Sequence, residues 1–297
     1  MKKRSFVYIY YILTLVGAAT LLGSCQLGKH YTRPELPLPA RLDTMGTDST
    51  SLADYSWEQL YTDTTLQSLI RKTLNYNKDM LIAAARVKEL AAMKRIDYAN
   101  MFPALGLKVY GEKEGTDENG THYKPSDDFY LKLGITWELD LWGNLRWARD
   151  KSLAEFMGSI ENQRALKMSM IAQVAQSYFE LVALDNELSI VRQTVNARRE
   201  SLHLARIRFE GGLTNETAFR QAQVELARTV TLVPDLEKKI AVKENEIAFM
   251  TGEFSYHVSR SKLPEDVVLP DTLPVGLPST LLERRPDVRQ AEQSLIA

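Results

Sequence analysis

The chain has 297 residues, of which 44% are hydrophobic and 25% are charged, and its formal net charge is −1. This composition excludes disordered and collagen-like chains, and the near-neutral charge argues against a nucleic-acid binder, which normally carries a basic excess. The single cysteine excludes a disulfide framework and any zinc site built on paired cysteines. Four scattered histidines leave little material for metal catalysis.

The N-terminus has the features of an export signal. Residues 2–4 are Lys-Lys-Arg, residues 6–22 are uncharged and mostly apolar, and Leu-Gly-Ser-Cys follows at 22–25. This box resembles the lipobox of bacterial lipoproteins, so residues 1–24 are predicted to be a signal peptide and Cys25 the site of lipid attachment. Two alternatives are a transmembrane anchor, since about 17 residues is the lower edge of a spanning length, and an ordinary secreted signal.

Residues 25–56 are predicted to be a lipidated, extended tether. Prolines at positions 34, 37 and 39 precede a stretch rich in Thr, Ser and Asp, a composition that favours extended chain. Gln26 follows the cysteine in place of the aspartate that retains lipoproteins in the inner membrane. The expected location is therefore the outer membrane, with the chain extending into the periplasm.

Residues 57–102 are predicted to be helical. Leucine and isoleucine recur with a spacing near 3.6 over 57–76, which predicts a short helix. A second helix is expected to run through Asn100, with Asn77 as its N-cap. Pro103 then ends it, because proline cannot continue the hydrogen-bond ladder of a helix.

Residues 103–140 are predicted to form a β-hairpin, with a first strand over 105–110, a polar loop over 112–128 and a second strand over 129–139. The side chains expected to face the membrane are Phe129, Leu131, Leu133, Ile135 and Trp137, followed by Leu139. About ten alternating residues match a tilted membrane strand, and aromatic residues lie near both of its ends. The alternative is a soluble hairpin that covers a core.

Residues 141–252 are predicted to form a long coiled-coil hairpin. The segment 145–209 contains no proline, and apolar residues recur in it at steps of three and four. The seam consists of Ile171, Val174, Tyr178, Leu181, Leu188, Val191, Val195, Leu202, Ala205 and Phe209. Asp185 and Arg198 interrupt it.

The hairpin is expected to turn at residues 210–215, where Gly-Gly can end the first helix. Thr214 or Asn215 would cap the return helix over 216–250. Pro234 is expected to kink that helix.

Residues 253–286 are predicted to be a Pro-rich connection, and residues 287–297 to begin a second copy of the preceding unit. At a constant spacing, Leu74, Asp79, Ala83 and Val87 match Leu282, Asp287, Ala291 and Leu295. The chain is thus expected to hold the first of two internal repeats, truncated. Two such repeats would supply two β-hairpins, fewer strands than the about eight of the smallest membrane barrels. Subunits would therefore have to share one barrel.

Three stretches carry a resemblance to one known family. Trp-Glu-Leu-Asp-Leu-Trp-Gly-Asn-Leu-Arg at 137–146 is similar to its strand-to-helix junction, and Arg-Phe-Glu-Gly-Gly-Leu-Thr-Asn-Glu at 208–216 to its periplasmic hairpin tip. Leu-Pro-Val-Gly-Leu-Pro-Ser-Thr-Leu-Leu-Glu-Arg-Arg-Pro-Asp at 273–287 resembles its most diagnostic motif. The family is that of the TolC-like outer-membrane efflux proteins, in the NodT-type lipoprotein branch that serves resistance-nodulation-division pumps. Ala218 departs from the acidic residue usual after the tip.

The resemblance implies a mainly α fold with a small β part. A long antiparallel helical hairpin would belong to a periplasmic α-barrel, and a β-hairpin would contribute to a trimeric outer-membrane β-barrel. The implied function is the exit duct of a tripartite efflux pump, a passive conduit for small molecules with no catalytic residues, cofactor or metal.

The resemblance also implies partners. These are two further copies of the chain in a homotrimer, outer-membrane lipid, a periplasmic adaptor (membrane fusion) protein and an inner-membrane resistance-nodulation-division transporter, but no nucleic acid. The adaptor is expected to dock on the hairpin tip, formed by Arg208, Gly211, Gly212, Leu213, Thr214 and Asn215.

Two other functions fit parts of the sequence. A periplasmic coiled-coil adaptor would also carry a lipid and a long hairpin, but it would lack the alternating strands. An enzyme would need a catalytic constellation, and the nearest carboxylates, Glu138 and Asp140, have no nucleophile or base beside them. The acidic turn at 117–120 resembles a calcium loop only loosely, because it lacks the glutamate at the twelfth position.

Overall fold

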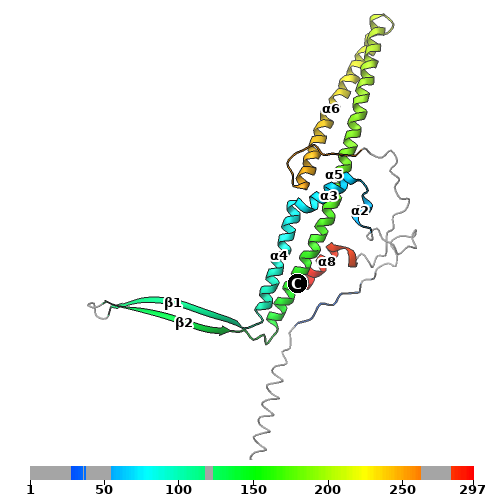
Figure 1. The fold of residues 1–297 in the computed structure, drawn as a ribbon. Coiled ribbons are helices and arrows are strands. Elements are labelled where there is room, and N and C mark those ends of the chain that lie inside the picture. The colour runs from blue at the N-terminus through cyan, green and yellow to red at the C-terminus, as the bar shows by residue number, and fades with distance from the viewer. Residues whose placement is uncertain (1–27, 36, 38–54, 118–122, 262–281) are drawn as a thin grey trace, which may run out of the picture. The chain divides into compact units, whose positions relative to one another are not determined.

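The computed structural model describes residues 28–35, 37, 55–117, 123–261 and 282–297 (Figure 1). The predicted signal peptide, Cys25, nearly all of the tether and much of the Pro-rich connection lie outside these residues. The chain divides into two compact units. One comprises residues 1–36, 86–160 and 290–297, and the other comprises residues 37–85 and 161–289; they are called the sheet unit and the hairpin unit below.

The hairpin unit begins with two short helices, α2 (Trp57–Leu60) and α3 (Thr64–Tyr76). The prediction of one helix over 57–76 is wrong. Asp63 starts a new helix, because its carboxylate accepts hydrogen bonds from the backbone N–H of Thr65 at 2.7 Å and of Leu66 at 3.2 Å. An aspartate that caps the following turn competes with continuation of the preceding one.

Helix α4 (Lys78–Ala99) begins as predicted at the Asn77 cap. The Asn77 side-chain oxygen accepts from the N–H groups of Asp79 at 2.9 Å and Met80 at 3.2 Å. Its amide also donates to the carbonyl of Met250 at 3.0 Å. Asn77 is buried, so its one side chain pairs two free N–H groups at the start of α4 and one carbonyl group near the end of α6.

The long hairpin consists of α5 (Asn144–Glu210) and α6 (Glu216–Thr251), which lie side by side in the hairpin unit (Figure 1). The part of α5 from 161 to 210 is about 75 Å long at 1.5 Å per residue. Helix α6 runs through Pro234 without interruption, and the expected kink stays a prediction.

The predicted seam forms the core of this unit over its middle part. The buried residues include Val174, Tyr178, Leu181, Leu188 and Val195 of α5, Leu236, Ile240 and Ile247 of α6, and Leu66, Leu69 and Ile70 of α3. Toward the tip the seam is less buried, and Phe209 is 37% exposed. Burial of apolar area therefore holds the hairpin together mainly away from its tip.

The sheet unit contains the antiparallel pair β1 (Ala104–Asp117) and β2 (Tyr123–Thr136). The prediction of a loop over 112–128 is wrong, since the ladder continues to the pair Asp117–Tyr123. Strand pairing satisfies backbone groups whatever the side chains, so polar residues do not end it. The predicted end of the second strand at 139 is also wrong, because the ladder begins at Ala104–Thr136, directly after Pro103, which has no N–H to donate.

Helix α8 (Pro286–Ile296) starts one residue before the predicted position, with proline in its first turn. In the sheet unit, residues 28–35 lie against α5 and α8. The Arg33 guanidinium binds the Glu292 carboxylate through two hydrogen bonds of 2.7 and 2.5 Å. The rings of His30 and Trp147 lie 5.0 Å apart, and a Cβ on Gly28 would lie 2.7 Å from the Trp147 ring.

Helix α6 ends at Gly252, whose φ of +72° favours glycine. Replacing Gly252 with alanine is expected to destabilise the hairpin unit strongly, because the new Cβ would lie 2.6 Å from the carbonyl oxygen of Tyr76. Gly212→Ala is the matched control: its φ is +71°, but nothing lies within 4 Å of the added atom. The backbone strain common to both costs about 1–2 kcal/mol.

Thermal unfolding in detergent, followed by circular dichroism, measures both variants. Gly252→Ala should melt at a lower temperature than Gly212→Ala. Equal losses would contradict the close approach at Tyr76.

Candidate functional site

The β-hairpin has one strongly apolar face. The register pairs Leu105 with Ile135, Leu107 with Leu133, Val109 with Leu131, and Gly111 with Phe129. The large side chains of this face are 63–86% exposed in the single chain. A sheet face of this kind needs an apolar environment, because leaving it in water forfeits about 25 cal/mol per Å².

Trp137, which was expected on this face of the strand, lies beyond the end of β2. Its indole Nε1–H donates to the carbonyl of Met101 at 3.2 Å, just after α4. Trp137 and Trp142 remain 57% and 67% exposed. Trp137 and Trp142 thus follow the end of β2 in the chain and do not extend the strand.

Asp140 fixes the passage from β2 into α5. Its carboxylate accepts hydrogen bonds from the backbone N–H groups of Leu145 and Arg146, both at 3.1 Å, and from the Arg146 side chain at 3.1 Å. Burial alone would raise the pKa of Asp140, but these hydrogen bonds outweigh it and hold the pKa below its usual value. The carboxylate therefore serves as a helix cap, and the sequence signal for it is the spacing of Asp140 and Arg146.

The hairpin tip is built by a Schellman motif. Leu213 N–H donates to the Arg208 carbonyl at 2.8 Å, and Gly212 N–H donates to that of Phe209 at 3.0 Å. Asn215, of the two residues expected to cap α6, accepts from the N–H of Ala218 at 3.2 Å.

Two partly exposed aromatic rings, one from each helix, pack together beside the turn. Phe209 and Phe219 stack with centroids 5.7 Å apart and planes 1° from parallel. Leu213 projects outward and is 78% exposed. The turn therefore presents an apolar side chain to any partner while the helices behind it are held together.

A partly buried polar network joins the start of α3 to the middle of α5. The Tyr178 hydroxyl donates to the Asp63 carboxylate at 2.7 Å and accepts from the N–H of Ser261 at 3.0 Å. Burial, and then the neighbouring carboxylate, raises the pKa of Tyr178. Burial would also raise the pKa of Asp63, but the hydrogen bonds from Tyr178, Leu66 and Thr65 outweigh it and lower that pKa.

Arg260 links both helices of the hairpin to the segment that follows α6. Its guanidinium binds the Asp185 carboxylate on α5 and the Glu244 carboxylate on α6, and it donates to the Val258 carbonyl at 2.8 Å. The hydrogen bonds to Asp185, followed by those to Glu244, raise the pKa of Arg260. The polar interruption at Asp185 thus has a structural partner, which the sequence could not indicate because the two residues are far apart in the chain.

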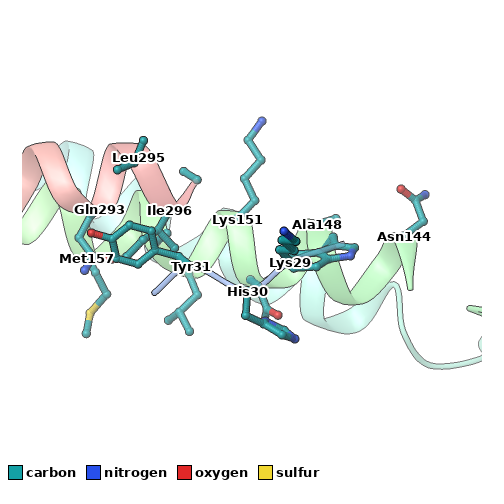
Figure 2. A pocket seen from close by; sticks show the side chains of 15 residues that line it. Lys29, His30, Tyr31, Asn144, Ala148, Lys151, Met157, Gln293, Leu295 and Ile296 are labelled. Atoms are coloured by element: carbon teal, nitrogen blue, oxygen red, sulfur yellow. The ribbon is translucent and has the colours of Figure 1, made fainter. Parts of the chain in front are cut away.

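An open groove lies in the sheet unit beside residues 29–31. Figure 2 shows Tyr31, Met157 and Ile296 along it, with α5 and α8 as its walls. Its lining is mostly apolar and contains no nucleophile beside a base.

The described part of the chain contains no group of three or more His, Cys, Asp or Glu side chains arranged to hold a metal ion. Among its helices, none is both long and apolar enough to cross a bilayer.

The sequence model of the outer membrane efflux protein family matches residues 69–253. The toluene efflux pump outer membrane protein TtgC of Pseudomonas putida is 28% identical over 305 residues, covering 96% of this chain. The probable outer membrane lipoprotein SilC of Salmonella typhimurium is 27% identical over 295 residues, again covering 96% of this chain. The chain spans 61% of the length of TtgC and 62% of that of SilC.

The fold is also similar to that of a solved channel. A crystal structure of CusC superposes with a TM-score of 0.77 at 24% identity, covering 92% of this chain and 61% of CusC. The predicted class, a mainly helical chain with a long hairpin and a small β part, is confirmed by this likeness.

The Asp63 network makes stability depend on pH. Because the folded-state pKa of Asp63 is lowered, its ionised form stabilises the fold above the unfolded-state pKa of about 4, and this contribution is lost as pH falls through the folded value. We expect Asp63→Asn, which keeps a capping side chain but loses the charge, to reduce the free energy of unfolding by about 1 kcal/mol at pH 7 and by progressively less as pH falls below about 4.

Denaturant unfolding at several pH values, followed by circular dichroism, measures this difference. Glu225→Gln is the matched control, because it neutralises a carboxylate on the surface of α6 whose pairing with Arg228 is solvent-exposed. A loss for Asp63→Asn that did not change with pH would contradict the assignment.

Proposed function

The chain belongs to the outer membrane efflux protein family, and we propose that it forms part of a passive channel that lets small molecules leave the cell through the outer membrane. The observation that carries the proposal is the β-hairpin with one exposed apolar face, in a chain that also holds a long helical hairpin. Such a hairpin fits a membrane barrel, whose strands alternate apolar outward and polar inward.

We propose that the barrel is shared among subunits, as a homotrimer. A pair of strands has two open edges, and unpaired backbone groups cannot lie in lipid. Closure therefore requires further strands, from the same chain or from other copies. The apolar face from Leu105 to Ile135 would then meet lipid, and the opposite face would line the water-filled path.

The helical hairpin would continue this path through the periplasm, and its tip would dock on an adaptor protein bound to an inner-membrane resistance-nodulation-division transporter. The exposed Leu213 and the rigid Gly-Gly turn support the tip as the contact surface. The transporter would supply the energy, since a conduit performs no chemistry.

We also propose that Cys25 carries the lipid that anchors the chain in the outer membrane. The lipobox-like sequence at 22–25 supports this, as does the name of SilC, a probable outer membrane lipoprotein. Several acyl chains would anchor the protein firmly, at about 0.8 kcal/mol per buried methylene.

The alternative of a periplasmic adaptor is not favoured. TtgC and SilC are both named as outer membrane proteins, and the exposed alternating strands have no role in a coiled-coil adaptor. The relatives' names differ in cargo, since TtgC belongs to a toluene pump and CusC to a cation efflux system. The cargo of this chain is therefore proposed only as small molecules.

The channel proposal is tested by assembly of the full chain in the outer membrane. Wild type should run as a heat-modifiable trimer on unheated gels and fractionate with the outer membrane. Leu133→Arg should abolish both, because an arginine near the bilayer midplane costs about 2–4 kcal/mol per subunit. Lys132→Gln, its neighbour on the polar face, should assemble normally.

A wild-type monomer in the inner membrane would refute the channel proposal. Normal trimers of Leu133→Arg would show instead that this face does not meet lipid.

Adaptor docking is tested at the tip. Leu213→Glu should reduce crosslinking to the adaptor at least several-fold while trimers persist, because it places a charge in a contact expected to be apolar. The measurement is adduct formation from a photoreactive residue at position 214. Leu213→Met, which keeps the apolar surface, should crosslink like wild type, and an unaltered yield for Leu213→Glu would place the contact elsewhere.

A further inference from the structure

The polar face of the β-hairpin carries two lysines directly opposite one another. The register pairs Lys108 with Lys132, between the pairs Gly106–Gly134 and Tyr110–Tyr130 on the same face. Directly opposed residues of an antiparallel pair have Cβ atoms about 4.5–5.5 Å apart. The ladder thus places the two lysine side chains next to each other on one face of the sheet.

This arrangement is unfavourable for the fold alone. Like charges in directly opposed positions destabilise a sheet. Both lysines are exposed, and neither forms an ion pair with any residue in the described part of the chain. No described acidic side chain offsets the repulsion between the two positive charges, so a negatively charged ligand bound here would reduce it.

The neighbouring pairs leave space for such a ligand. A Cβ added to Gly134 would meet nothing within 4 Å, so the sheet is open on one side of the lysines. On the other side, the rings of Tyr110 and Tyr130 stack with centroids 5.0 Å apart and planes tilted by 22°. They offer an aromatic surface next to the positive charge.

Acidic residues in the same hairpin lie farther along. The register pairs Glu112 with Asp128, four residues beyond the lysine pair on each strand. At about 3.3 Å per residue this separation is roughly 13 Å, which exceeds the Debye length of about 10 Å in 0.1 M salt. The backbone positions of this acidic pair thus lie farther than one Debye length from those of the lysine pair.

We propose that Lys108 and Lys132 form an anion-binding band inside the channel, suited to small organic anions that carry an aromatic ring. The inference rests on the proposed function, because this face lines the path only if the opposite face meets lipid. In a trimer the pair is repeated around one lumen, and rings of lysine are a known basis of anion selectivity in pores. The acidic group of the ligand would bind the ammonium groups, and its ring would contact the tyrosines.

The experiment measures ion selectivity of the full-chain trimer in planar bilayers with a gradient of potassium chloride. The double variant Lys108→Gln, Lys132→Gln should lower the permeability ratio of chloride to potassium at least twofold in 0.1 M salt. The difference should shrink in 1 M salt, where the Debye length is about 3 Å. The charge-preserving double variant with arginine should match wild type, as should Lys151→Gln, which removes a charge outside the sheet.

A second measurement tests the ligand class. Naphthalene disulfonate, added to one side, should block the wild-type current, and the glutamine double variant should need at least a tenfold higher concentration for the same block. Unaltered selectivity and block in the double variant of a conducting channel would overturn this inference alone. Absence of any conductance by wild-type trimers would overturn the channel proposal, and the anion band with it.

Discussion

The open edges of a two-stranded sheet constrain this protein more than any single contact. Strands β1 and β2 satisfy one another along a long ladder, but each outer edge presents unpaired N–H and C=O groups. The same sheet exposes an apolar face that water disfavours. Lipid removes the cost of the exposed apolar face, but it makes the unpaired backbone groups at the edges far more costly. The sheet is therefore stable in a membrane only when further strands close it. Association is thus a condition of the fold in its proposed setting.

In the helical part, capping side chains pair the backbone groups that are left free at the helix ends. A long helix leaves unpaired backbone groups only at its ends, so the described ends decide whether neighbouring segments are held in register. Asp63, Asn77, Asp140 and Asn215 each cap a helix here, and the first two also bond to a distant segment. Arg260 then ties the segment after α6 to both helices of the hairpin.

Periodicity predicted the long elements well. The seam of α5, the cap at Asn77 and the apolar face of the sheet all follow from local repeats in the sequence, and each is present. The extension of the ladder into 112–128 could not be predicted. Strand pairing is made by backbone groups, and the mostly polar side chains here show no alternation of apolar and polar residues. The break at 61–63 depends on whether Asp63 caps or stays in solvent, a choice decided by its contact with the distant Tyr178. The role of Arg260 could not be predicted for the same reason, since Asp185 lies 75 residues away in sequence.

The stacked phenylalanines at the hairpin tip have a mechanical consequence. The fully buried part of the α5 seam ends near Val195, and close to the turn the stacked rings of Phe209 and Phe219 also join the two helices. Separating the two helices at the tip must unstack these rings, which costs about 1 kcal/mol, and it must also strain the glycine turn. Because the rings hold the two helices together at the tip, a force applied there moves both helices together. The hairpin then bends most easily near Val195, where the fully buried seam ends.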